Sequence, residues 1–183
     1  MAKPWVHQNK LKRIDIPSYS KILRYVKEIE DKKVRALFSI LYLTAARISE
    51  VVRRMEKKDI EIIEKDGKKI MLVTLFNEKN KQRKIKKIPI NIEKEYPLVV
   101  AFLEYVDSIE DDVIFKFSRK HAFKLLRKYV GVNPHYIRHI RLTHLVTEFN
   151  FNEYELKIFA GWTDTRPAKS YIEMRWSDLI KKL

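Results

Sequence analysis

The C-terminal third of the chain carries side chains that could bind an anion and transfer a proton. His135 and Arg138 follow Pro134, and a tyrosine lies at position 171. A histidine exchanges a proton near neutral pH, an arginine pairs with oxyanions, and a tyrosine hydroxyl becomes a nucleophile once its proton is removed. Each residue alone is more often an ordinary surface or packing residue. Their order and spacing together indicate a site.

The segment around these residues is expected to be helical. Pro134 suits the first turn of a helix, because its missing N–H would be unpaired there. His135 and Arg138 are three residues apart, so their side chains project from one helix face.

The rest of the pattern predicts an α+β fold that is mostly α, with a small three-stranded antiparallel sheet inserted after the first helices. Helices are expected from Ser18, from about Lys33 to Thr44, and over a short stretch that carries Arg47. Strands are expected at Asp59–Ile63, Ile70–Phe76 and Lys84–Ile90. Further helices are expected at about 93–107, 118–130, 134–149, 152–160 and 166–175.

Composition points to a polyanionic partner. The 183 residues include 39 Lys and Arg against 24 Asp and Glu, a formal charge of +15. Such a surplus repels itself, and nucleic acid is the commonest partner that relieves it; an anionic membrane surface or a solvated lysine-rich surface are the alternatives. The chain has no cysteine, which excludes disulfides and thiolate metal sites, and no cofactor is expected.

The chain shows neither a membrane span nor a secretory signal. No stretch approaches the roughly 20 apolar residues that a span needs, so an intracellular, cytoplasmic protein is expected. Residues 1–17 are basic and lack helical periodicity, which suggests an arm or linker remnant before a single domain at 18–183.

Four segments together resemble the tyrosine recombinase, or phage integrase, family. They are Thr44-Ala45-Ala46-Arg47-Ile48-Ser49-Glu50, Pro134-His135-Tyr136-Ile137-Arg138-His139, Gly161-Trp162 and Tyr171. They resemble the family's first-arginine box, its His-x-x-Arg box, its His-or-Trp position and its nucleophile, in family order and with a hairpin between the first two. The resemblance spans about Ser18 to Met174. It implies the catalytic domain of a site-specific DNA recombinase, which cuts and rejoins strands through a 3′-phosphotyrosyl intermediate.

The resemblance implies a role for each of these residues. Tyr171 would attack the DNA phosphate, while Arg47 and Arg138 would hold the phosphoryl oxygens and neutralise their charge. His135 would take or return a proton. Trp162 stands where many members carry histidine; its indole N–H can donate to a phosphate oxygen but cannot carry a proton onward.

The leaving 5′-oxygen needs a proton, which the family takes from a lysine on the hairpin. An exact alignment places Glu78 at that position, so Lys79 is the residue expected to act, with Lys81 as the alternative. Lys81, Arg83, Lys84 and Lys86 are expected to contact DNA phosphates. Glu50 would either orient an active-site cation or form a simple helix salt bridge. His139 is expected to support the site structurally.

The resemblance also implies partners and leaves alternatives open. Double-stranded DNA is the expected substrate, with self-association into a dimer or tetramer on it. Larger members carry an N-terminal helical domain, so this chain would be either a fragment or a catalytic-only version. A DNA-binding module that has lost catalysis, or a topoisomerase-like enzyme that nicks and relaxes DNA, would have similar sequences.

The first prediction is that strand cleavage needs no divalent metal. Two arginines can balance the charge of the transition state, and the sequence contains no carboxylate cluster with metal-ligand spacing. Cleavage should therefore proceed at an unchanged rate in EDTA. Cleavage that stops in EDTA and returns only with magnesium would contradict this mechanism.

Overall fold

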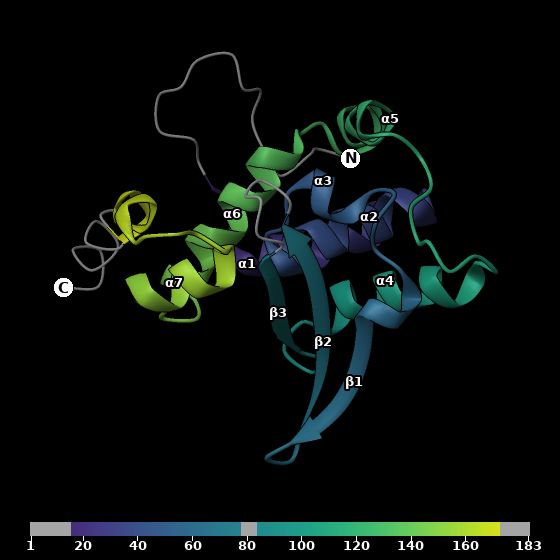
Figure 1. The fold of residues 1–183 in the computed structure, drawn as a ribbon. Helices are drawn as coiled ribbons and strands as arrows, with labels where there is room; N and C mark the ends of the chain where they lie inside the picture. Colours follow the sequence, from purple (N-terminus) through teal and green to yellow (C-terminus); the bar gives the residue numbers. More distant parts are fainter. Residues whose placement is uncertain (1–15, 78–83, 173–183) are drawn as a thin grey trace.

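The computed structural model describes residues 16–77 and 84–172 as helical blocks around one small sheet (Figure 1). The first helices are α1 (Tyr19–Tyr25), α2 (Lys32–Thr44) and α3 (Ile48–Val51). The strands are β1 (Ile60–Lys65), β2 (Lys68–Asn77) and β3 (Lys84–Asn91). The later helices are α4 (Tyr96–Ser108), α5 (Arg119–Leu125), α6 (Pro134–Thr147) and α7 (Glu153–Ala160). The α+β, mostly α fold with an inserted three-stranded antiparallel sheet is thus confirmed.

Several of the expected helices have different bounds. The helix expected from residue 93 begins at Tyr96, because Pro97 fits only its first turn. The helix expected at 118–130 divides into α5 and a π-helical segment, Leu126–Val130. The helix expected from residue 166 starts as a 3-10 turn, Arg166–Ala168. Among the described residues, none of the helices is both long and apolar enough to cross a bilayer.

Helix α2 forms the centre of the core. Every residue from Ala36 to Thr44 is buried, and α2 packs against α4 and α6. A helix that is buried all round has to be enclosed by other elements, so α2 fixes where its neighbours lie. The helix begins where the Asp31 carboxylate accepts the Val34 N–H at 3.0 Å.

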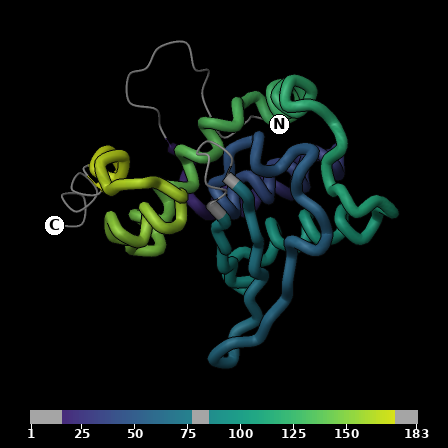
Figure 2. Tube along the Cα trace, viewed as in Figure 1, coloured from purple at the N-terminus to yellow at the C-terminus, as the bar shows by residue number. Residues whose placement is uncertain are grey.

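The sheet is an antiparallel meander in the order β1-β2-β3. Strand β2 pairs with both neighbours, and Leu75 lies opposite Lys86. The β1–β2 turn at Asp66 and Gly67 projects away from the helices (Figure 2). Most residues of β1 are exposed. The inner face of β2 and β3 covers the helical core with Met71, Val73, Leu75, Ile88 and Ile90.

A buried ion pair joins α6 to the start of α4. Arg141 donates to both carboxylate oxygens of Glu95, at 3.1 and 2.5 Å, and both side chains are almost fully buried. The Arg141 guanidinium also lies over the rings of Tyr42, Phe149 and Phe159. A bidentate pair of this kind satisfies two buried charges at once, because each partner supplies the other's hydrogen bonds.

His144 connects the same region to the N-terminal segment. Its Nε2 lies 2.8 Å from the Pro17 carbonyl oxygen and its Nδ1 lies 2.6 Å from the Tyr42 hydroxyl. A carbonyl can only accept, so Nε2 carries the proton and Nδ1 accepts from Tyr42. Burial is the main cause that lowers the pKa of His144 to about 4, and Arg141 lowers it further. The ring is therefore neutral at neutral pH.

The second prediction concerns stability in acid. The unfolded chain protonates His144 near pH 6.5, whereas the folded chain does so near pH 4. The free energy of unfolding should therefore be constant above about pH 6.5 and fall by about 3 kcal/mol towards pH 4 from this residue alone. Urea unfolding of His144→Gln should show a shallower decline than the wild type over this range. The control variant, His121→Gln at an exposed position, should follow the wild type. Parallel curves for wild type and His144→Gln would contradict this account.

Candidate active site

The turn after α2 carries the first of the expected arginines. Ala45 ends the helix with a left-handed φ of 47°, a conformation that costs a residue with a side chain about 1 kcal/mol or more. The Thr44 hydroxyl accepts the Ala46 N–H at 3.2 Å and donates to the Ile40 carbonyl at 2.6 Å. These bonds hold the turn in place. Arg47 follows as the N-cap of α3 and stays partly exposed.

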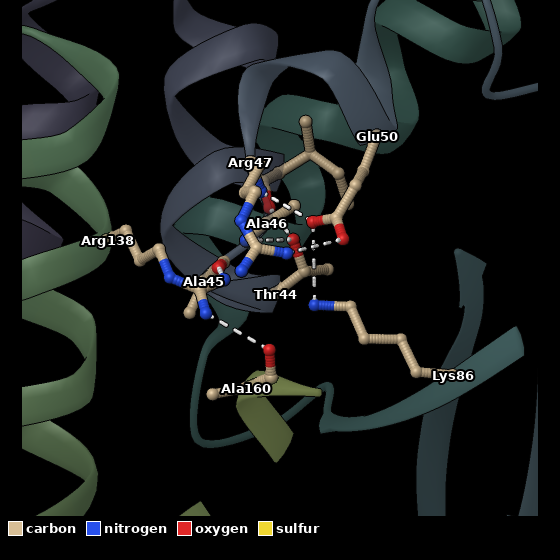
Figure 3. Close-up of polar contacts among 9 residues, drawn as sticks. Thr44, Ala45, Ala46, Arg47, Glu50, Lys86, Arg138 and Ala160 are labelled. Carbon is tan, nitrogen blue, oxygen red and sulfur yellow. Dashed lines mark hydrogen bonds and ion pairs between the residues drawn. The ribbon is translucent and has the colours of Figure 1, made fainter. Parts of the chain in front are cut away.

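The second arginine, Arg138, extends from α6 to the ends of two other helices (Figure 3). Its Nη1 donates to the Ala45 carbonyl, and its Nη2 donates to the Ala160 carbonyl at 3.0 Å. The side chain is 8% exposed. A guanidinium has five N–H donors, so the two carbonyls leave three for a ligand. Burial and the nearby Arg47 lower the pKa of Arg138 from its usual value.

One buried carboxylate, Glu50, holds the cations of the site together (Figure 3). Its Oε2 accepts the backbone N–H of Arg47 at 2.6 Å, and its Oε1 lies 3.6 Å from Arg47 Nη1. Its Oε2 also lies 3.6 Å from Nζ of Lys86. Glu50 thus contacts both the arginine and a lysine, which agrees with an orienting carboxylate more closely than with an isolated surface pair.

Lys86 lies inside the site rather than on the surface. Residues 85–90 of β3 alternate between exposed and buried, and Lys86 shares the buried face with Ile88 and Ile90. The period of two in a strand therefore directs this lysine inward. The sequence predicted a phosphate contact for this lysine and did not predict that its side chain is buried. The alternation of Lys86, Ile88 and Ile90 is the sequence signal that points to it.

Tyr171 lies between an indole and an imidazole. Its ring stacks on Trp162 at a centroid distance of 6.0 Å, and its hydroxyl lies 3.4 Å from Nδ1 of His139. Burial raises the pKa of Tyr171 while Arg138 lowers it, so the hydroxyl keeps its proton at neutral pH. Burial lowers the pKa of His139, which favours a neutral ring able to accept a proton.

Of the other residues expected at the site, some are described by the structure and others are not. His135 is exposed on the first turn of α6, and within the described residues no hydrogen bond or ring contact joins it to Tyr171. Lys79, Lys81 and Arg83 lie outside the described residues. Lys84 begins β3, paired with Asn77.

A cleft adjoins the site on the side of Arg47. It has a volume of about 660 Å³ and is open to solvent. Its basic lining residues are Arg47, Arg53, Arg54, Arg119 and Lys120, with Ser49 and Ser118 among the others. The lining residues come from α3, the turn after it, β2 and the start of α5, segments that the sequence analysis did not connect. Nothing in the local sequence pattern pairs these segments.

The arrangement suits an oxyanion. Arg47, Arg138 and Lys86 supply three positive charges against the single negative charge of Glu50, a formal balance of +2. A phosphate or similar group could be held by the remaining N–H donors of the arginines. Within residues 16–77 and 84–172, no group of three His, Cys, Asp or Glu side chains is placed to hold a metal ion.

Known proteins resemble the chain in both sequence and structure. The model of the phage integrase family matches residues 12–177. The XerH site-specific recombinase bound to difH, a pre-cleavage complex, has 16% identity and a TM-score of 0.63 over 84% of this chain and 47% of that one. The post-cleavage complex of XerH with palindromic difH has 18% identity and a TM-score of 0.64 over 89% and 50%. XerA recombinase has 18% identity and a TM-score of 0.61 over 84% and 58%.

The structural similarity establishes the fold. This chain spans about half the length of the XerH chains it matches. Among proteins of curated function, none matches its sequence significantly.

The third prediction is that Glu50 stabilises the folded protein through its charge. Glu50→Gln keeps a hydrogen-bond acceptor for Arg47 but leaves three cations without a carboxylate. Removing one partner of a buried ion pair costs about 3 kcal/mol. Urea unfolding at pH 7 should show a loss of this order. Glu93→Gln, at an exposed position beside α4, should lose almost nothing. Equal stabilities of the two variants would show that the Glu50 charge is not needed.

Proposed function

The chain belongs to the phage integrase family, and we propose that it is the catalytic domain of a tyrosine-type site-specific DNA recombinase. The observation that carries this proposal is the double contact of Arg138 with the Ala45 and Ala160 carbonyls. It brings the ends of α2 and α7 to one place. Arg47 follows the first end and Trp162 follows the second. This contact supports the proposal that the two expected arginines act in one site.

In the proposed reaction, the Tyr171 oxygen attacks the phosphorus of a DNA phosphodiester. The bond between phosphorus and the 5′-oxygen breaks, and a 3′-phosphotyrosyl bond forms in its place. Arg47 and Arg138 hold the non-bridging oxygens, whose charge grows in the transition state. A free 5′-hydroxyl then attacks the phosphotyrosine, which reverses the step and rejoins a strand.

The Tyr171 hydroxyl has to lose its proton as it attacks. His135 is the residue that the family resemblance assigns to this transfer. The 3.4 Å contact of Tyr171 with His139 supports His139 as a second acceptor, because its ring is half-buried and favoured as neutral. Trp162 would stack on the tyrosine and donate its indole N–H to a phosphate oxygen.

The leaving 5′-oxygen would take its proton from Lys79, with Lys81 as the alternative. Both are hairpin residues outside the described part of the chain, so this assignment rests on the sequence. Lys81, Arg83 and Lys84 are proposed to contact phosphates along the backbone of the DNA. Such contacts add affinity that falls with salt and carry no sequence information.

Double-stranded DNA is the proposed partner. The formal charge of +15 and the basic cleft beside Arg47 both favour a polyanion. The solved XerH structures are complexes with the difH substrate. We also propose that the protein assembles as a dimer or tetramer on DNA, because strand exchange joins two sites. Action on DNA would place it inside the cell, at the nucleoid.

Two other functions fit the same fold. A DNA-binding module without catalysis would bind DNA and form no covalent adduct. A topoisomerase-like enzyme would form adducts and relax DNA without exchanging strands between two sites. An assay for covalent adducts separates the binding module from the two enzymes. A strand-exchange assay between two sites then separates the topoisomerase-like enzyme from a recombinase.

The fourth prediction tests Tyr171 as the nucleophile. Tyr171→Phe retains the ring that packs on Trp162 and removes only the attacking oxygen. Incubation with a randomised pool of nicked duplexes should trap covalent protein–DNA adducts with the wild type. The variant should form none, while its affinity for duplex DNA stays unchanged. Tyr154→Phe, at an exposed position on α7, is the matched control and should form adducts normally. Adducts that persist in Tyr171→Phe would refute the assignment.

A further inference from the structure

Lys86 is a buried lysine for which the reaction proposed above has no assigned use. Its side chain is 8% exposed and lies on the inner face of β3, opposite Leu75. A Cβ at Gly161 would lie 3.4 Å from Cδ of Lys86, so the end of α7 lies against the lysine stem. The residue is therefore enclosed between the sheet, α3 and the turn after α7.

The ammonium group of Lys86 has an ion-pair contact but no hydrogen bond within the described residues. Nζ of Lys86 lies 3.6 Å from Oε2 of Glu50, and this distance is longer than a hydrogen bond. Nη1 of Arg47 and Oε1 of Glu50 are likewise buried without a hydrogen-bond partner. Unsatisfied buried polar atoms destabilise a fold, and an apolar residue at position 86 would avoid that cost. A lysine at this position is thus better explained by the site than by the core.

We propose that Lys86 is a positioning residue of the phosphate site, holding Glu50 against Arg47 and setting the net charge of the site by its own protonation. This role rests on the proposed function. Glu50 touches Lys86 through Oε2, the same oxygen that accepts the Arg47 backbone N–H. The lysine thereby acts on the substrate through Glu50 and Arg47, and its buried nitrogen need not touch the DNA.

The charge of the site matches the reaction only when Lys86 carries its proton. With Lys86 charged, three cations and Glu50 give +2; without the proton the balance is +1. A phosphodiester carries one negative charge, and the transition state of its displacement carries about two on the phosphoryl oxygens. The protonated lysine therefore stabilises the transition state more than the ground state, which is the condition for a faster reaction.

The surroundings of Lys86 bring its pKa close to physiological pH. Burial lowers the pKa of Lys86 to about 8, with Arg138 and Arg47 lowering it and Glu50 opposing them. Among the described residues, these are the charged side chains that act on it, Arg47 and Glu50 from the start of α3 and Arg138 from α6. Leu75 on β2 and Gly161 after α7 carry no charge. A bound anion favours the charged form, so anion binding above pH 8 should take up a proton.

The first experiment measures sulfate binding, because sulfate keeps two negative charges throughout the range from pH 7 to 9.5. Isothermal titration at constant ionic strength should show wild-type affinity falling about tenfold over this range, the effect expected of one nearby charge. Lys86→Arg should bind sulfate with a nearly constant affinity, and Lys86→Met should bind weakly at both ends. Lys87→Arg is the control, since Lys87 is exposed on the opposite face of β3 and should follow the wild type.

The second experiment measures cleavage of nicked duplexes that the wild type cuts. Lys86→Met should slow adduct formation about tenfold at pH 7, and Lys86→Arg should restore most of the rate because it keeps the charge. When sulfur replaces the bridging 5′-oxygen of the substrate, the leaving group departs without needing a proton. That substrate should not rescue Lys86→Met selectively, whereas it should rescue Lys79→Ala if Lys79 is the proton donor.

The two experiments separate this proposal from the proposed function. A wild type that forms no adduct would refute the recombinase, while the sulfate profiles would still decide the role of Lys86. Identical sulfate profiles for wild type and Lys86→Arg would overturn the positioning role even if adducts form. Selective rescue of Lys86→Met by the sulfur substrate would also overturn it, because the lysine would then be the proton donor. Urea unfolding verifies that each variant is folded, and Lys86→Gln replaces any that is not.

Discussion

The arrangement of the site depends on one buried guanidinium. A buried guanidinium needs acceptors for its N–H groups, and the Ala45 and Ala160 carbonyls at the ends of their helices need donors. The two hydrogen bonds from Arg138 to these carbonyls meet both needs. The consequence is geometric, because α2, α6 and α7 are joined at one point although their residues are far apart in the chain. The arginine still has donors left for a ligand, so the group that builds the site can also bind within it.

The site tolerates an excess of positive charge because one carboxylate is buried with it. Glu50 contacts the Arg47 backbone, the Arg47 guanidinium and Lys86, and so limits the repulsion among the cations. It does not remove that excess. A formal charge of +2 in a partly buried space is costly without a ligand and favourable with an oxyanion, since attraction strengthens where water is excluded. The same imbalance therefore limits stability and favours binding.

The core behind the site is held by polar contacts as well as by packing. His144 joins α2 to the N-terminal segment through Tyr42 and Pro17, and Arg141 joins α6 to Glu95. Both residues lie on α6, the helix that also carries Arg138 and His139. One face of α6 thus anchors the helix in the core while another supplies the site. The position of α6 therefore fixes where the Arg138 guanidinium contacts the ends of α2 and α7.

The sequence by itself determined the elements and the order of the reactive residues. Helical patterning predicted α2 and α6, and three short strands rich in Ile and Val with tight connections predicted the meander. The resemblance of four segments to the phage integrase family indicated Arg47, Arg138, Trp162 and Tyr171 as site residues. Only the tertiary structure decided which histidine meets Tyr171, because His135 and His139 lie one turn apart on α6 and the position of Tyr171 depends on how the chain packs after α7. It also decided that Lys86 pairs with Glu50. Alternation shows which side of a strand faces inward. It does not show that the residue contacted there, Glu50, comes from a helix distant in sequence.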